Sequence, residues 1–215
     1  MSLRSRWAAL GPTTLFVLLW SSGGIFSKLA LNSASVFLVL SLRFAVALLA
    51  LLSLRLFGRR LLPDAGTNRR VALTGLVLIG GYSSFYFLAL SHGVTPGTLA
   101  TILGAQPILT LGFFDKRFSI SRWSGVGLAF GGLVLTVFQT IGLSDASGLG
   151  IAFALLALAG ATIGGILQKR VKQAPERVLP LQLAVSALLC LVLLPMQATT
   201  IQFSWHLVVA LLWLG

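Results

Sequence analysis

Apolar stretches long enough to cross a bilayer follow one another along almost the whole chain. An α-helix rises about 1.5 Å per residue, so about 20 apolar residues span a hydrocarbon core of about 30 Å. Such stretches lie at residues 13–31, 35–57, 71–91, 96–114, 123–142, 148–168 and 178–196, and another begins near Trp205. Because a chain inside hydrocarbon must satisfy its own backbone hydrogen bonds, this pattern predicts an all-α, polytopic membrane helix bundle.

The composition also indicates a membrane protein. Of the 215 residues, 57% are apolar and 9% are charged, whereas soluble domains carry about 25% charged residues. The net charge of +12 is gathered in short basic clusters between the apolar stretches. A nucleic-acid interface needs a continuous basic face. The sequence therefore predicts the lipid bilayer as a partner and no nucleic acid.

The basic clusters occupy alternate linkers. All Lys and Arg residues except Lys28 and Arg43 lie near the N-terminus or in the linkers around Arg59, Lys116 and Lys169. Basic linkers of membrane proteins stay in the cytoplasm. We therefore expect a multi-pass protein with a cytoplasmic N-terminus.

One short motif occurs twice. "GGIFSK" at residues 23–28 returns as "GGILQK" at residues 164–169, an offset of 141 residues. The copies lie in the first and sixth spans, and an odd number of spans per unit gives two units of opposite topology. The sequence predicts a five-helix unit over residues 13–142 and part of a second, inverted unit over residues 148–215. We expect a ten-span protein that is incomplete after the start of the eighth span, with a natural truncation or a shorter relative as open alternatives.

Particular residues mark individual spans. Trp20 lies in the middle of the first span, "RF" stands at residues 43–44, "QP" at residues 106–107 and "WSGVG" at residues 123–127. In this order they resemble the EamA-type transporters of the drug/metabolite transporter superfamily. The resemblance implies ten helices in two inverted five-helix units that move metabolites such as amino acids across a bacterial inner membrane. Asp115 departs from the pattern, because the family usually has Glu there.

Arg43 has the highest free-energy cost of insertion among the residues of the predicted spans. It lies eight residues into the second span, near the midplane, where an arginine costs on the order of 3 kcal/mol on insertion scales. The acidic residues all fall in linkers: Asp64, Asp115, Asp145 and Glu176. We expect Arg43 to bind backbone carbonyls, water or an anionic group of a substrate. A structural role and substrate contact both stay open.

Lys28 lies near the outer end of the first span. Its aliphatic stem allows the ammonium group to reach the headgroups. Lys28 also lies close to the helical face of Trp20, Gly24 and Ser27, because residues three, four and eight apart share a face. We therefore consider Trp20 and Lys28 as candidate substrate-binding residues that line an outward vestibule, with snorkelling of Lys28 as the alternative.

Polar segments also interrupt the third and fourth spans. Pro107 lacks an N–H group and frees a carbonyl near Leu103, so Gln106 and Pro107 predict a kink with polar groups in the middle of the membrane. Tyr82 and Tyr86 are expected to line the same cavity. The alternatives are a kink that serves packing and tyrosines that serve ordinary interhelical hydrogen bonds.

The remaining notable residues indicate packing or surface roles. The glycine pairs within residues 127–131 and 160–164 match the small-residue helix-packing motif. His92 and His206 have no neighbours with the spacing of metal ligands, and Cys190 lies among apolar residues. The sequence predicts no metal and no cofactor.

Together with the resemblance, which implies amino acids or related compounds as substrates, these observations predict a transporter of small polar or anionic metabolites that works by alternating access and exports its substrate. Proton coupling through Asp or Glu is not expected, since no acidic residue lies in a span. A membrane enzyme is disfavoured because no nucleophile–base or metal constellation is visible. A truncated or non-transporting fragment, an assembly subunit and a homodimer stay open.

Overall fold

The structure is a computed structural model that describes residues 3–53, 61–114, 120–143 and 146–215. Asp115, Lys116, Arg117 and Asp145 lie outside these ranges, as does the end of the predicted 35–57 span. Throughout the described ranges the chain forms helices and no strands, which confirms the all-α membrane bundle.

The helices follow the predicted spans closely. Their bounds are α1 Leu3–Leu31, α2 Val36–Ser53, α3 Asn68–Gly75, η2 Leu76–Gly81, α4 Tyr82–Ser91, α5 Pro96–Leu103, α6 Gln106–Phe114, α7 Ile120–Leu143, α8 Gly148–Lys169, α9 Pro175–Leu193, η3 Leu194–Met196 and α10 Trp205–Leu214. Five apolar segments of the described chain are long enough to cross a membrane: Gly11–Leu31, Val36–Ser53, Asn68–Ser91, Gly148–Lys169 and Pro175–Met196. We call Asn68–Ser91, which comprises α3, η2 and α4, the third span.

The stretch at residues 96–114 forms two helices instead of one. α5 ends at Leu103, and α6 begins at Gln106. The amide of Gly104 donates to the Ala100 carbonyl at 2.8 Å, and that of Ala105 donates to the Ile102 carbonyl at 3.1 Å. Since the next residues include Pro107, which has no N–H to continue the ladder, the kink takes the form of a break in the helix.

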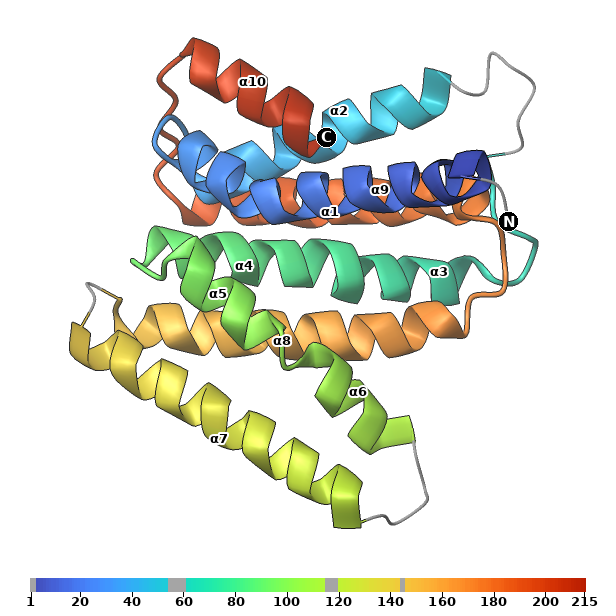
Figure 1. Cartoon of the computed structure of the whole chain (residues 1–215). Coiled ribbons are helices and arrows are strands. Elements are labelled where there is room, and N and C mark those ends of the chain that lie inside the picture. The colour runs from blue at the N-terminus through green and yellow to red at the C-terminus, as the bar shows by residue number, and fades with distance from the viewer. Residues whose placement is uncertain (1–2, 54–60, 115–119, 144–145) are drawn as a thin grey trace.

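Hydroxyl residues start three helices at the same end of the bundle. The side chains of Thr95, Ser147 and Ser204 accept hydrogen bonds from the first turns of α5, α8 and α10. Such capping satisfies amides that have no partner within the helix. We call this the capped end. The opposite, basic end is where α3 begins, α8 ends and α9 begins (Figure 1).

Segments far apart in sequence lie side by side. α2 packs along α9, α8 packs along α4, and α1 packs along α10 (Figure 1). Two buried clusters hold these pairs together. One surrounds Phe44 of α2 and Phe87 of α4, and the other surrounds Leu99 and Ile102 of α5 with Leu158 of α8.

Glycines bring the third span close to its neighbours. A Cβ atom at Gly75 would lie 2.6 Å from the Cα atom of Gln182 on α9, and one at Gly164 of α8 would lie 2.6 Å from the Cα atom of Leu78. Real Cβ atoms do not approach backbone so closely. The third span therefore fits between α8 and α9 because side chains are absent at these points.

The predicted glycine motifs have different outcomes. A Cβ atom at Gly160 would lie 3.4 Å from the Tyr82 backbone, so Gly160 and Gly164 both serve the packing of α8 on the third span, as predicted. The prediction is wrong for Gly127 and Gly131 of α7, since no described atom lies within 4 Å of a Cβ at either position. Spacing alone does not distinguish a packed glycine pair from an exposed one.

The outer surface of the bundle is apolar. Leu49 of α2 is 67% exposed, and Leu128 of α7 and Leu188 of α9 are also exposed. Large exposed apolar surfaces are rare on soluble monomers. They suit a protein whose outer solvent is lipid.

Candidate functional site

Arg43 lies in the middle of α2 and faces the interior of the bundle. Its Nε donates a hydrogen bond to the Leu214 carbonyl of α10 at 2.9 Å, and its guanidinium carbon lies 5.8 Å from the centre of the Phe44 ring. Within the described ranges no carboxylate forms an ion pair with Arg43; the described pair of Asp64 is with Arg177. A guanidinium has five N–H donors, and the hydrogen bond to α10 uses the Nε donor.

Tyr82 and Tyr86 of α4 stand beside this cation. They are four residues apart and therefore share one helical face, with ring centres 5.8 Å apart. Both phenols lie within the electrostatic reach of Arg43. The structure thus brings together three of the predicted site residues, from two different helices.

α1 closes one side of this group through Gly24. A Cβ atom there would lie 3.0 Å from the Tyr86 hydroxyl. Ser27 is buried on the same helix, whereas Trp20 is 68% exposed and Lys28 is exposed. The four residues of the predicted face therefore divide into an inward and an outward pair. Substrate contact by Trp20 and Lys28 stays a prediction.

Gln106 approaches from the broken fourth span. Its Nε2 donates to the Ala161 carbonyl of α8 at 3.1 Å. The neighbouring Gly160 lies against the Tyr82 backbone, so Gln106 and Tyr82 reach α8 at the same level. Pro107 is exposed.

A comparison with protein families bears on these residues. The model described as the EamA-like transporter family matches residues 10–138, which is more than half of the chain and includes the positions of Arg43, Tyr82, Tyr86 and Gln106. This chain belongs to the EamA-like transporter family. The resemblance found in the sequence is thereby confirmed. No curated protein and no solved structure matches the chain.

The EamA-like chain contains a π-helical turn that was not predicted from the sequence. η2 covers Leu76–Gly81 and leads directly into Tyr82, whose amide donates to the Val77 carbonyl, five residues back. Such turns widen a helix locally and occur often at functional sites. The pair Gly80–Gly81 was the available sequence signal.

A buried glutamine also escaped the sequence analysis. Gln182 of α9 is 1% exposed, and its Nε2 donates to the Gln168 side-chain oxygen of α8 at 2.8 Å. The Ser186 hydroxyl donates to the Gly75 carbonyl at 3.1 Å. The signal was the single glutamine within the apolar run "LPLQLAVSALL".

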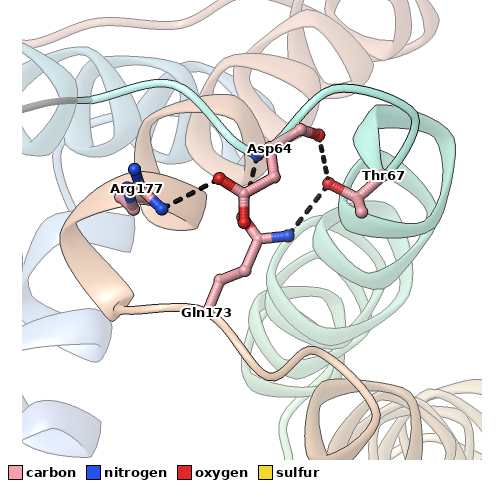
Figure 2. A network of polar contacts seen from close by, with 4 residues as sticks. All are labelled: Asp64, Thr67, Gln173 and Arg177. Carbon is pink, nitrogen blue, oxygen red and sulfur yellow. Dashed lines mark hydrogen bonds and ion pairs between the residues drawn. The ribbon is translucent and has the colours of Figure 1, made fainter.

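Polar contacts connect two linkers at the basic end (Figure 2). The Arg177 guanidinium lies 2.9 Å from a carboxylate oxygen of Asp64. The Gln173 side chain accepts from the Asp64 amide at 3.0 Å and donates to the Thr67 hydroxyl at 2.9 Å. We call these four residues the Asp64 clasp. It joins the linker before α3 to the start of α9.

Backbone contacts connect two linkers at the capped end. The Gln202 amide donates to the Ser33 carbonyl at 2.7 Å, and the Ser35 amide donates to the Thr200 carbonyl at 3.1 Å. The Ser33 and Ser204 hydroxyls lie 2.9 Å apart. We call these contacts the Ser33 bridge. Both ends of the bundle are thus tied between segments more than 100 residues apart in sequence.

Proposed function

We propose that this EamA-like protein exports small polar or anionic metabolites, amino acids or related compounds, across a bacterial inner membrane by alternating access. The observation that carries the proposal is the position of Arg43, a cation in the middle of α2 that faces Tyr82 and Tyr86 and has no carboxylate partner in the described ranges. An intramembrane cation that faces protein is a functional-site candidate.

The chemistry of these side chains suits a carboxylate. Arginine binds carboxylates through charge-assisted hydrogen bonds, and the nearby phenols can donate hydrogen bonds to the same group or accept them from an ammonium. Gln106 offers an amide at the level of Tyr82. Binding near the middle of the membrane is the arrangement that alternating access requires.

The packing of the helices supports two inverted units. In two related units that begin at α1 and α8, α2 is equivalent to α9, and the third span is equivalent to α10. The packing of α1 on α10 should then have a counterpart in the packing of α8 on the third span, and equivalent helices α2 and α9 should pack on each other. All three contacts are present. This supports the division into residues 13–142 and 148–215. The basic end would then face the cytoplasm together with the N-terminus.

Transport by Arg43 variants tests the proposal. The purified protein is reconstituted into liposomes, and uptake and efflux of a panel of radiolabelled amino acids are measured. A lost hydrogen bond to a charged group is worth about 1.5–3 kcal/mol, so Arg43→Ala should raise the half-saturating amino acid concentration by about 10- to 150-fold. Arg43→Lys, which keeps the charge, should be affected less. Leu49→Ala serves as the control, because Leu49 is on the same helix and 67% exposed.

Each negative result has a distinct meaning. Unchanged transport by folded Arg43→Ala protein would make the role of Arg43 structural. Failure of the unmodified protein to move any amino acid, sugar or amine would contradict transport and favour an assembly subunit. Chemical cross-linking of the reconstituted protein would decide whether it works as a homodimer.

A further inference from the structure

A basic hollow lies at the end of the bundle where α3 begins and α8 ends. Its volume is about 380 Å³, and it is lined by Arg70, Leu167, Lys169, Arg170 and Lys172. Of the five lining residues that the structure describes, four are cations. The volume lies in the range of small-molecule binding sites, about 300–1,000 Å³.

The depth of the hollow is set by two membrane spans. Arg70 lies in the first turn of the span Asn68–Ser91, and Lys169 is the last residue of the span Gly148–Lys169. The cations therefore stand at the boundary between hydrocarbon and water, and Leu167 supplies an apolar wall on the membrane side. Phosphates of lipid headgroups lie at this level.

The local electrostatics favour an anion. No acidic side chain is among the described residues that line the hollow, and the carboxylate of Asp64 is bound to Arg177 within the Asp64 clasp. The end of α8 would repel an anion through its free carbonyls. Two of these carbonyls are occupied, because the Arg170 amide donates to Leu167 and the Val171 amide donates to Gln168, both at 3.0 Å.

The Asp64 clasp links the two walls of the hollow. One wall, with Arg70, follows Thr67 by three residues, and the other, with Lys172, directly precedes Gln173. The hydrogen bond between Gln173 and Thr67, 2.9 Å long, therefore connects the two walls. The backbone segments that carry Arg70 and Lys172 are thus linked before any ligand binds.

We propose that this basic hollow binds a phosphate group, and that its depth assigns this phosphate to the headgroup of an anionic phospholipid. Basic pockets between membrane helices on the cytoplasmic side are suited to such headgroups. The site is separate from Arg43 and does not depend on transport, so it can be tested by binding alone.

Lipid-dependent stability of the full chain tests the proposal. Thermal unfolding is measured in detergent during titration with phosphatidylglycerol or with phosphatidylcholine, which has the same phosphate but no net charge. Stabilisation should saturate with phosphatidylglycerol only. Each interfacial cation contributes about 1 kcal/mol to the binding of anionic lipid. Arg70→Gln should therefore raise the phosphatidylglycerol concentration that gives half-maximal stabilisation about fivefold, and the double variant Arg70→Gln, Arg170→Gln should raise it about 25-fold.

Arg69→Gln is the matched control. Arg69 is the neighbour of Arg70, is also exposed and is not among the residues that line the hollow, so phosphatidylglycerol should stabilise this variant as it stabilises the unmodified protein. Equal stabilisation by both lipids, or equal effects of the Arg69 and Arg70 variants, would overturn the proposal. Saturating stabilisation by inorganic phosphate or glycerol 3-phosphate at the same concentrations would overturn the assignment to lipid. Lys172→Gln provides a second lining variant if the double variant does not fold.

Discussion

At the scale of single residues, the absence of side chains matters as much as their chemistry. Gly164 lies where α8 meets the π-helical turn, and its Cβ position is 2.6 Å from the Cα atom of Leu78. Backbone at this distance cannot move away as a flexible side chain can. The approach of α8 to the third span therefore depends on a hydrogen atom at this position.

Gly164→Ala should destabilise the protein. Overpacking of this kind costs about 1–3 kcal/mol, which should appear as a lower free energy of unfolding in mixed micelles, followed by circular dichroism. Gly127→Ala is the control, since its Cβ would have no described neighbour within 4 Å and alanine is the better helix former. An equal change in the free energy of unfolding for the two variants would show that the close approach at Gly164 does not contribute to stability.

The candidate site could be predicted in part at this scale. Arg43 was identifiable because a charge in the middle of an apolar span has a high free-energy cost, and Tyr82 and Tyr86 because they belong to a polar segment of the third span. The Leu214 carbonyl was not predictable. A backbone acceptor carries no sequence signal, and this one lies 171 residues away from Arg43.

At the scale of elements, the Asp64 clasp connects the linker before α3 to the start of α9 through side chains that reach water. Asp64 is 55% exposed, and Arg177 is 30% exposed. Exposed ion pairs contribute about 0–1 kcal/mol. The clasp therefore positions the two segments without holding them tightly.

A double-mutant cycle with Asp64→Asn and Arg177→Gln measures this coupling. We expect a coupling energy below about 1 kcal/mol, reduced further by added salt, from the unfolding free energies of the four proteins. The exchanged pair Asp64→Arg, Arg177→Asp should recover most of the unfolding free energy that the single variants lose. A coupling energy above about 3 kcal/mol would be typical of a buried pair and would contradict this description.

Spans were predictable from hydropathy because a helix in lipid must satisfy its own backbone hydrogen bonds and carry mostly apolar side chains over its whole length. The start of the third span was predicted at residue 71 and lies at Asn68, a typical boundary error for polar ends. The π-helical turn was not predicted, because Leu76–Gly81 is apolar like the rest of the span and differs from it only by the pair Gly80–Gly81. The break near Pro107 was indicated, since proline removes a defined hydrogen bond.

At the scale of the whole molecule, the Ser33 bridge ties the linker between α1 and α2 to the linker before α10. The proposed alternating access requires the two units to separate at one end of the bundle in one state and to meet there in the other. If the capped end is the outer end, as proposed, its contacts must break during each cycle.

A disulfide at this position should stop the cycle. In a Cys190→Ala background, Ser33→Cys and Ser204→Cys would place two sulfur atoms where oxygens lie 2.9 Å apart, and a disulfide needs about 2.05 Å. Oxidation should lower liposome transport on the order of tenfold, and a reductant should restore it. The single-cysteine variants control for the loss of the Ser204 cap. Full transport by oxidised, cross-linked protein would contradict separation at this end.

The hydrogen bond between Arg43 and Leu214 also has a consequence for biosynthesis. Its two residues are 171 positions apart, and chains are synthesised at about 5–20 residues per second. Arg43 therefore emerges from the ribosome roughly 10–30 s before the carbonyl that will accept its hydrogen bond. During that interval the nascent chain must rely on water, lipid headgroups or the insertion machinery to stabilise a cation in the membrane. The time that Arg43 spends without its partner in α10 is set by the order of translation, which the finished fold does not reveal.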